Sequence, residues 1–435
     1  MKMLPLAVEL NEHIKNASPN AYHCLSETGK QIFFPSGILV QSAEAKVKAT
    51  KFNATIGIAL ENYEPMHLGG VKRYFNHLRD DEIFTYAPPD GLLELRKLWK
   101  EKMIRHNPSL AGKKISLPVV TSALTNAISL TADLFVDAGD VVILPDKMWG
   151  TYRLIFSTRK GARLETFPMF NKEGKFNVAA MAALLNNEAK TQKKLTVLLN
   201  FPNNPTGYTP SSAECQSIYD VIFEAANKGT RVVTLSDDAY FGLFYEDSIK
   251  ESLFGGLCDL HENVMAVKLD AATKENFVWG FRTGFVTFGT VSQDSDSLYP
   301  ALETKLKGLL RSTVSSSNHS SQCIIAKFLK DSDYESSILE KFQILKGRAL
   351  KLKEILSDNR FDQDWDFYPF NSGYFMLLRL HHVNAERLRQ HLLDQYQIGT
   401  ISIGESDLRI AFSCIEEEDL EELVSLLHKA VRDLS

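Results

Sequence analysis

The middle of the chain alternates between short apolar runs and longer amphipathic stretches. The apolar runs are rich in Val, Ile and Leu, show no alternation of apolar and polar residues, and lie at 117–120, 140–145, 195–200, 231–236, 264–269 and 283–288. Runs of this kind are typical of buried strands in a mostly parallel sheet. The stretches at 124–136 and 213–228 indicate crossover helices between such strands. The pattern therefore predicts an α/β domain.

The C-terminal third has a different pattern. A long charged stretch at 331–358 predicts a helix, and the runs at 373–380 and 407–413 predict strands. Further helices are expected at 385–396 and 416–434. We therefore expect a smaller α+β domain after the large one. We predict three parts. An N-terminal segment at 1–74 packs on the small domain, the large domain spans 75–305, and the small domain spans 306–435.

Composition narrows the possible partners. The chain has 435 residues, 44% hydrophobic content and a formal net charge of −5, with no basic stripe, so we expect neither nucleic acid nor an anionic membrane as a partner. We expect no signal peptide and no membrane span, because no apolar run approaches the ~20 residues that a span needs. The five cysteines are far apart and include no CxxC pair, which favours a reducing, cytoplasmic location and argues against disulfides or a metal site.

Several reactive side chains follow predicted strands, where open α/β sheets bind their ligands. Lys274 offers an amine that could bind an aldehyde covalently, and Asp237 offers a carboxylate that could keep a pyridine nitrogen protonated. Asp238 is the alternative to Asp237. Tyr240 and Asn204 could reach a phenolic oxygen. Together these groups fit pyridoxal phosphate.

The same ligand needs a phosphate site and a surface for its ring. Arg282 supplies a planar fork that suits phosphate oxygens. The turn at 121–127 leads into a helix, whose free N–H groups attract phosphate, and Ser122 and Thr125 could add hydroxyl donors. An ordinary capped helix start is the alternative. Trp149 offers a flat face for the pyridine ring.

Three motifs together resemble the class I/II aminotransferases, enzymes of fold type I that use pyridoxal 5′-phosphate (PLP). These are Asn-Asn-Pro-Thr-Gly at 203–207, Asp237-x-x-Tyr240, and Lys274 followed by Gly-Phe-Arg-Thr-Gly at 280–284. The resemblance runs from about residue 53 to the C-terminus and is closest to the aspartate aminotransferase type. It implies a large domain with a mostly parallel seven-stranded sheet flanked by helices, a smaller α+β domain, and a homodimer with shared active sites.

The resemblance also implies roles for individual residues. Lys274, Asp237 and Tyr240 would be catalytic. The cofactor would be held by Ser122, Ala123, Leu124, Thr125, Trp149, Asn204, Asp237, Tyr240, Thr273, Lys274 and Arg282, with Tyr86 reaching the phosphate of the neighbouring subunit. Arg409, Gly57 and Asn204 would bind the substrate. The chain departs from the family pattern at three places: Ala123 stands where Gly is usual, Ala271 stands where a serine is usual, and the segment 371–375 is one in which other members vary.

The function expected from the resemblance is transfer of an amino group from an L-amino acid to a 2-oxo acid by a ping-pong mechanism. Arg311 falls where some relatives place a second arginine for a distal carboxylate, which would favour aspartate or glutamate. Tyr374 and Phe375 could instead accept an aromatic substrate. A PLP-dependent lyase that performs β-elimination is an alternative on the same fold. A DNA-binding regulator is disfavoured, because no basic helix-turn-helix precedes the fold.

Overall fold

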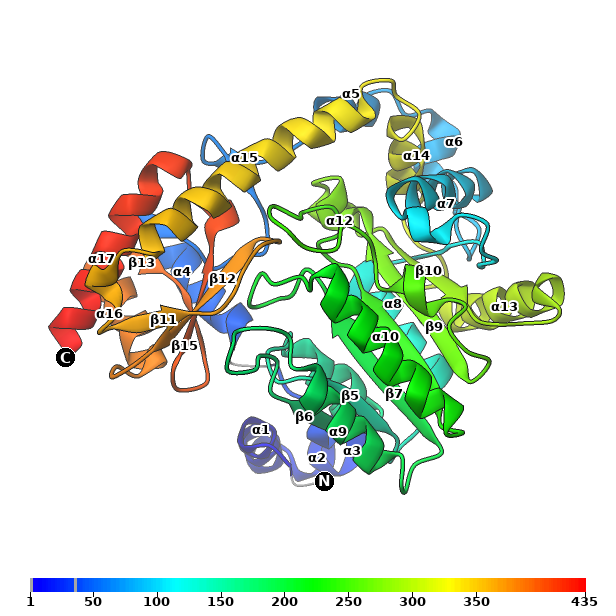
Figure 1. Ribbon diagram of the computed structural model, residues 1–435, viewed down its shortest axis with the longest axis horizontal. Coiled ribbons are helices and arrows are strands. Elements are labelled where there is room, and N and C mark those ends of the chain that lie inside the picture. The colour runs from blue at the N-terminus through cyan, green and yellow to red at the C-terminus, as the bar shows by residue number, and fades with distance from the viewer. Residues whose placement is uncertain (1–2, 35–36) are drawn as a thin grey trace.

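The apolar runs form one sheet in the middle of the computed structural model, which describes residues 3–34 and 37–435 (Figure 1). The seven strands are, in spatial order, β4 (Val119–Thr121), β10 (Gly284–Gly289), β9 (Val264–Ala271), β8 (Arg231–Asp237), β7 (Lys194–Asn200), β5 (Val141–Pro145) and β6 (Arg163–Phe167). β10 pairs antiparallel with both neighbours, whereas the other pairings are parallel. The mostly parallel seven-stranded sheet is therefore confirmed.

The strand that the apolar pattern misses is β6. It lies at the edge of the sheet, and its side chains at 163–166 are exposed or half-buried. Arg163 and Glu165 interrupt the apolar run there, and they form an ion pair of 3.1 Å. An edge strand has one free side, so its sequence need not be continuously apolar.

Helices cover the sheet, and the predicted crossover helices are present. α8 (Ala123–Phe135) and α10 (Ser212–Asn227) match the stretches expected at 124–136 and 213–228. α10 begins with a capping box between Ser211 and Glu214, which satisfies free N–H groups at its first turn. The other helical elements of this part are α7 (Leu93–His106), η1 (Pro108–Leu110), η2 (Arg153–Arg159), α9 (Val178–Glu188), α11 (Phe254–Leu257), α12 (Ala272–Glu275), η3 (Trp279–Phe281) and α13 (Ser295–Thr313).

The smaller domain is built on a four-stranded antiparallel sheet. In spatial order its strands are β11 (Trp365–Phe367), β12 (Phe375–Leu380), β15 (Asp407–Ala411) and β14 (Ile401–Ile403). Its helical elements are α15 (Tyr334–Leu356), η4 (Asn359–Phe361), α16 (Ala385–Tyr396), η5 (Phe412–Cys414), η6 (Glu417–Asp419) and α17 (Leu420–Leu434). The predicted strand at 373–380 begins at Phe375, because Gly373 adopts a left-handed conformation (φ 73°) in the preceding turn.

The N-terminal segment divides between the two domains. α1 (Pro5–Ala17), α2 (Pro19–Cys24) and α3 (Glu27–Gln31) pack on one another, and α3 contacts η2 of the large domain. α4 (Ile38–Lys48) and β1 (Phe52–Asn53) instead pack on the small domain, where β1 pairs with β13 (Ile398–Gly399). The segment continues with β2 (Leu60–Glu61), β3 (Glu64–Pro65), α5 (Gly69–Phe75) and α6 (Asp80–Phe84), and the two helices contact α14 (His319–Phe328).

The predicted boundary at 305/306 falls inside α13, which contacts α8 and β4 of the large domain. The domain limits stay a prediction. Among the residues that the structure describes, no helix combines the length and the apolar character that a bilayer crossing requires.

Strand register brings distant parts of the chain to one edge of the large sheet. Asn200, Asp237 and Leu269 are aligned across β7, β8 and β9. The segments that follow these strands therefore start side by side, and they carry the residues that the motifs singled out. The small domain lies beside this edge of the large sheet, and α4 packs on the small domain (Figure 1).

Candidate active site

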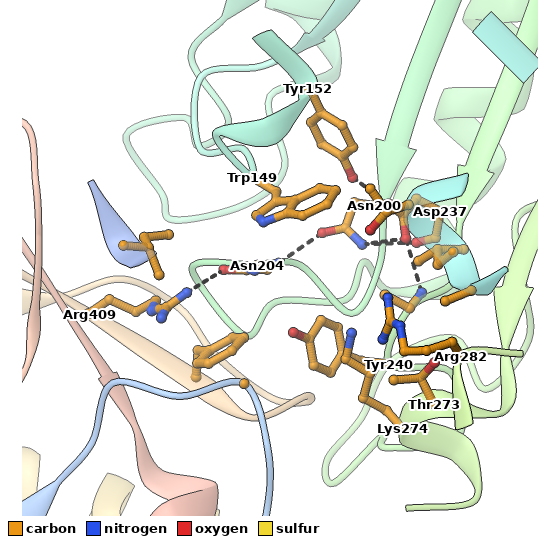
Figure 2. Close-up of a pocket in the computed structure, with 17 residues that line it drawn as sticks. Trp149, Tyr152, Asn200, Asn204, Asp237, Tyr240, Thr273, Lys274, Arg282 and Arg409 are labelled. Atoms are coloured by element: carbon orange, nitrogen blue, oxygen red, sulfur yellow. Dashed lines mark hydrogen bonds between the residues drawn. The ribbon is translucent and has the colours of Figure 1, made fainter. Parts of the chain in front are cut away.

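A cavity of about 220 Å³ lies where these strand ends meet the small domain (Figure 2). It gathers twelve of the residues expected from the sequence: Gly57, Ala123, Leu124, Thr125, Trp149, Asn204, Asp237, Tyr240, Thr273, Lys274, Arg282 and Arg409. It is also lined by Ile38, Tyr152, Asn200, Ala239 and Phe375. The residues that the strand-end pattern singled out therefore lie together around one cavity.

Lys274 lies on α12, directly after β9, and its amine stands 4.8 Å from the centre of the Tyr240 ring. Burial lowers the pKa of Lys274 to about 8, the charge of Arg282 lowers it further, and the charge of Asp237 opposes both effects. A substantial fraction of the amine is therefore neutral near pH 8, as a nucleophile or a proton acceptor requires.

Asp237 ends β8 and is buried. One carboxylate oxygen accepts a hydrogen bond of 2.5 Å from the Tyr152 hydroxyl, and the other accepts bonds from the Ala239 N–H (3.1 Å) and Asn200 Nδ2 (3.3 Å). Burial raises the pKa of Asp237, while the Tyr152, Ala239 and Asn200 donors and the charge of Lys274 act in the opposite direction. This carboxylate suits a ligand that brings a cationic N–H group.

Asp238, the alternative to Asp237, does not line the cavity. Its carboxylate accepts hydrogen bonds of 2.6 Å from Lys268 Nζ and from the Ser252 hydroxyl. Successive side chains of an extended segment point to opposite sides, so Asp237 and Asp238 cannot both face the ligand. The structure thus selects Asp237.

The opposite end of the cavity offers donors for an anion. α8 begins here, and within the described residues Ser122 makes no side-chain cap at its first turn, so N–H groups at this helix end are available. Thr273 Oγ1 is buried and has no hydrogen-bond partner among the residues that the structure describes. Arg282 lies in the left-handed region (φ 53°), and its Nη1 donates to the Trp279 carbonyl at 3.2 Å. These groups suit a phosphate.

Ala123 occupies the glycine position of the family in a conformation that favours glycine, with φ at 66°. Gly284 of β10 packs against the same turn, and a Cβ there would lie 2.6 Å from the Ala123 carbonyl carbon. Gly284 is therefore required for the close approach of the two backbones, whereas the Ala123 methyl group is tolerated with strain.

A second anion site lies at the small domain. Arg409 of β15 is buried, with Nη2 donating to the Thr55 carbonyl (2.7 Å) and Nη1 to Asn204 Oδ1 (3.0 Å). Its Nε has no partner among the described residues, and its guanidinium carbon stands 4.2 Å from the centre of the Phe375 ring. Burial lowers the pKa of Arg409 to about 10, which leaves it cationic at neutral pH. A carboxylate could bind here beside Gly57.

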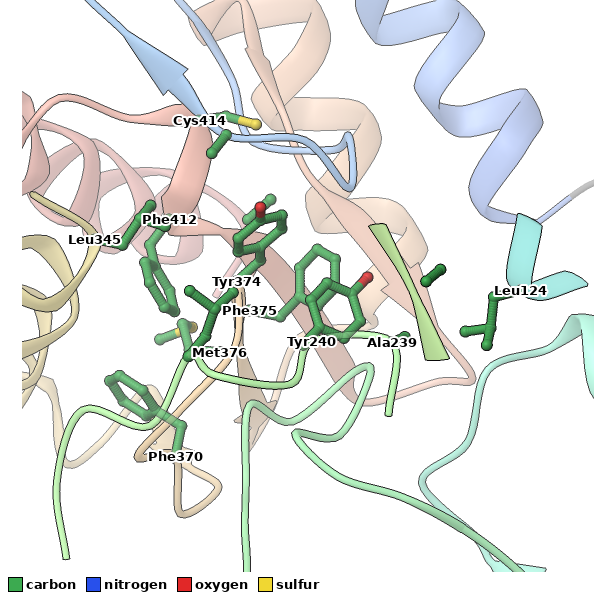
Figure 3. Close-up of a cluster of buried hydrophobic side chains, with 14 of the residues drawn as sticks. Leu124, Ala239, Tyr240, Leu345, Phe370, Tyr374, Phe375, Met376, Phe412 and Cys414 are labelled. Carbon is green, nitrogen blue, oxygen red and sulfur yellow. The ribbon is translucent and has the colours of Figure 1, made fainter. Parts of the chain in front are cut away.

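Four expected residues lie outside the cavity of this chain. Ser122 Oγ faces Ser317 Oγ at 3.5 Å, Tyr86 is 89% exposed, and Arg311 at the end of α13 donates to Ser315 Oγ. Tyr374 is fully buried beneath the cavity and packs edge-to-face on Tyr240, with ring centres 5.2 Å apart (Figure 3). The next residue, Phe375, lines the cavity instead, because adjacent side chains point to opposite faces at the start of β12.

Tyr152, Asn200, Ala239 and Ile38 were not expected in the site. Asn200 and Ala239 adjoin recognised motifs, and Tyr152 follows Trp149 by three residues, but nothing in the sequence indicates that its hydroxyl reaches Asp237. Ile38 begins α4, and no local pattern links that helix to the cavity.

Comparison with known proteins agrees with this geometry. The family model for aminotransferase class I and II matches residues 62–427. Aromatic-amino-acid aminotransferase 2 of Thermococcus litoralis is 24% identical over 233 residues, which cover 53% of this chain and 56% of that protein. The chain thus spans about half the length of this curated relative.

Two other similar proteins are matched over more of their length. The mitochondrial aspartate aminotransferase of Saccharomyces cerevisiae is 24% identical over 379 residues, which cover 78% of this chain and 75% of that protein. A crystal structure of an aminotransferase from Anaerococcus prevotii superposes with a TM-score of 0.83 at 23% identity, over 94% of this chain and 99% of that one. This likeness supports the fold.

The cavity itself fits the cofactor of this family. Its described lining residues include three cations, Lys274, Arg282 and Arg409, and one carboxylate, Asp237. An amine, a buried carboxylate and an unpaired hydroxyl at a helix start correspond to the aldehyde, the ring nitrogen and the phosphate of PLP. Because the family model matches most of its length, the chain belongs to the class I and II aminotransferases, which use PLP as their cofactor.

Proposed function

We propose that this protein is a PLP-dependent aminotransferase that moves an amino group between an L-amino acid and a 2-oxo acid by a ping-pong mechanism. The observation that carries the proposal is the placement of the Lys274 amine in one cavity with the Asp237 carboxylate and the Arg409 guanidinium. This arrangement could hold a PLP ring at one end and an amino acid carboxylate at the other.

The proposed cofactor contacts follow from the geometry of the site. Asp237 would face the ring nitrogen, Trp149 would stack on the ring, and Tyr240 and Asn204 would face the phenolic oxygen. The phosphate would be held by the N–H groups of Ala123, Leu124 and Thr125 and by the hydroxyls of Thr125 and Thr273, with Arg282. Ser122, whose Oγ faces Ser317, would have to turn its hydroxyl toward the cavity to join them. When bound, PLP supplies an electron-withdrawing ring that stabilises negative charge at the substrate Cα.

The protein residues would then orient the substrate and move its proton. Arg409 and the backbone at Gly57 would hold the α-carboxylate, which fixes the direction of the Cα–H bond. Lys274 would accept the Cα proton at its Nζ and later return a proton, and its lowered pKa suits that task near neutral pH. The buried, cationic Arg409 favours reactions that keep the α-carboxylate.

The lining of the cavity favours an apolar or aromatic amino donor over a dicarboxylic one. Apart from the residues proposed to contact the cofactor, the lining contains the apolar side chains of Ile38 and Phe375, and Arg409 is its only other cation among the described residues. Arg311 would have to act in the cavity of a neighbouring subunit to bind a distal carboxylate. The similarity to an aromatic and to an aspartate aminotransferase supports both classes, so aspartate and glutamate stay the second candidates.

We further propose a homodimer. Tyr86 and Phe84 are 89% and 79% exposed, and large apolar side chains at a surface are typical of an interface. Tyr86 would reach the phosphate site of the neighbouring subunit. Sedimentation of the purified protein tests this directly, since a monomer at micromolar concentration would contradict it. The five cysteines are unpaired, which supports a reducing, cytoplasmic location that microscopy of a tagged chain can test.

The decisive experiment is a visible absorbance spectrum of the protein loaded with PLP, before and after single amino acids are added. A donor should bleach the band of the bound cofactor, and 2-oxoglutarate should restore it. Lys274→Ala should abolish this cycle, with a loss of at least about 10²–10⁴-fold in rate, whereas Lys190→Ala on the surface should have no effect. Release of pyruvate and ammonia without an oxo acid would instead indicate β-elimination.

A further inference from the structure

A largely buried ion pair joins the two domains beside the cavity. Lys147 follows β5 of the large domain, and its Nζ lies 2.7 Å from Oδ2 of Asp407, the first residue of β15 in the small domain. The two side chains are 19% and 6% exposed. Tyr368 donates a hydrogen bond of 3.1 Å to the other oxygen of Asp407, and the Lys147 amine stands 4.9 Å from the centre of the Tyr368 ring.

Both partners lie two residues from a residue of the site. Lys147 precedes Trp149, and Asp407 precedes Arg409. Residues i and i+2 of a strand share a face, so Asp407 and Arg409 both point from β15 toward the large domain. Asp407 reaches Lys147 there, and Arg409 reaches Asn204.

A second link ties Lys147 to the substrate side of the cavity. Asn203 Nδ2 donates to the Lys147 carbonyl at 3.1 Å, and Asn203 is followed by Asn204, the partner of Arg409. The two domains are therefore connected twice at this place: Asp407 contacts Lys147, and Arg409 contacts Asn204 in the turn at 203–204, which is itself bonded to Lys147 through Asn203. A shift of the small sheet that separated Asp407 from Lys147 would also move Arg409 away from Asn204.

We propose that Lys147 and Asp407 are positioning residues that set the distance between Arg409 and the large domain, and thereby the affinity for the substrate carboxylate. The inference rests on the proposed function, in which Arg409 binds that carboxylate.

The surroundings of Lys147 keep it cationic. Burial by itself would lower the pKa of Lys147, but the hydrogen bond and charge of Asp407 outweigh burial and raise it. Removal of Lys147 leaves the buried Asp407 without its cation, and removal of the Asp407 charge leaves Lys147 with only the more distant Asp146 at 3.9 Å, which opposes the contact between the domains.

The test compares Lys147→Met, Asp407→Asn and the double variant with the native protein. The native protein loaded with PLP first identifies a donor that is turned over. Each single variant should raise KM for that donor by about tenfold with kcat within about threefold, because ground-state and transition-state binding of the carboxylate are lost together. The increase in KM of the double variant, expressed as a free energy, should be smaller than the sum of the two single increases, because no unpaired charge remains.

Two further readouts separate positioning from general damage. The dissociation constant of an α-methyl amino acid, which has no Cα proton to lose, should rise by the same factor as KM. The absorbance band of bound PLP and the affinity for PLP should stay unchanged. Asp407→Asn is isosteric and can keep its bond with Tyr368, so it provides a folded variant if Lys147→Met is unstable.

Two ion pairs serve as matched controls. Lys353 pairs with Glu246 between the two domains but away from the cavity, and Arg163 pairs with Glu165 at 3.1 Å on the edge strand β6. Lys353→Met and Arg163→Met should leave KM unchanged. Equal increases of KM in these controls, or an unchanged KM in folded Lys147→Met and Asp407→Asn, would overturn the positioning role. Absence of turnover by the native protein would instead overturn the proposed function.

Discussion

The Tyr152 hydroxyl donates a hydrogen bond of 2.5 Å to Asp237, a buried carboxylate that lines the cavity (Figure 2). Tyr152 directly precedes η2, a π-helix, and its ring packs edge-to-face on Trp149 with centres 5.5 Å apart. Burial and the charge of Asp237 raise the pKa of Tyr152 well above its ordinary value, so the hydroxyl stays protonated and remains a donor. One residue thus orients both the carboxylate and the ring platform proposed for PLP.

Tyr152→Phe should therefore weaken PLP binding by about tenfold, because a hydrogen bond to a charged group contributes about 1.5–3 kcal/mol. Titration of the protein with PLP, followed by absorbance, measures the change. Tyr208→Phe is the matched control, since Tyr208 donates a bond of 2.7 Å to Glu214 outside the cavity. Equal PLP affinity in Tyr152→Phe and native protein would show that Asp237 needs no donor from this position.

The pH dependence of cofactor attachment follows from Lys274. Its pKa is lowered to about 8, whereas a free lysine titrates at about 10.4. Since the neutral amine is the nucleophile, the rate at which cofactor-free protein binds PLP covalently should rise with pH and level off above about pH 8. Stopped-flow absorbance measures this rate, and Lys274→Arg should show no attachment. A rate that still increases steeply at about pH 10 would mean that Lys274 is not desolvated.

Ala123 offers a test of backbone strain. A residue other than glycine costs about 1–2 kcal/mol in the left-handed region, part of which the greater freedom of glycine in the unfolded chain offsets. Ala123→Gly should thus raise the free energy of unfolding by about 0.5–1 kcal/mol. Chemical denaturation provides the measurement. Ala127→Gly, inside the same helix, should destabilise by about 1 kcal/mol, and a similar loss in Ala123→Gly would refute the strain.

The sequence indicates which residues lie together where each of them follows a strand end. Lys274, Asp237 and Arg282 belong to motifs beside apolar runs, and the sheet register brings those strand ends together. The strand pattern alone does not distinguish Asp237 from Asp238, because their directions depend on the phase of the strand pleat; the family motif names Asp237, and Asp237 is the one that lines the cavity. For the same reason, the strand pattern does not indicate which of Tyr374 and Phe375 lines the cavity.

Other contributions depend on tertiary packing. Tyr152 reaches Asp237 because the chain enters a π-helix after Trp149, and an amino-acid sequence carries no clear signal for that geometry. Ile38 comes from a helix nearly two hundred residues before Asp237, with no periodicity to connect them. Tyr86 and Arg311 lie outside the cavity of their own chain, and only a partner subunit could give them the roles that the family resemblance implies.

A buried ion pair next to Lys274 leads to the last prediction. Lys102 of α7 pairs with Glu275, the residue after Lys274 on α12, and the Lys102 amine stands 4.3 Å from the centre of the Trp99 ring. Lys102→Met leaves the Glu275 carboxylate buried without its cation, which should destabilise the protein by about 3–5 kcal/mol at neutral pH. Lys330→Met, which removes an exposed pair with Glu94, should change stability little.

The loss in Lys102→Met should depend on pH, with a sign fixed by Glu275. Burial raises the pKa of Glu275 while Lys102 lowers it, so the variant should raise that pKa further. The folded variant then binds a proton that the unfolded chain releases above about pH 4.3, so its stability relative to the native protein should increase as pH falls from about 8 to about 5. Denaturation at both pH values measures the difference. The double variant Lys102→Met, Glu275→Gln should show no such pH dependence and should recover most of the lost stability. If Lys102→Met instead loses the same stability at pH 8 and at pH 5, the Glu275 carboxylate is not the cause of the loss.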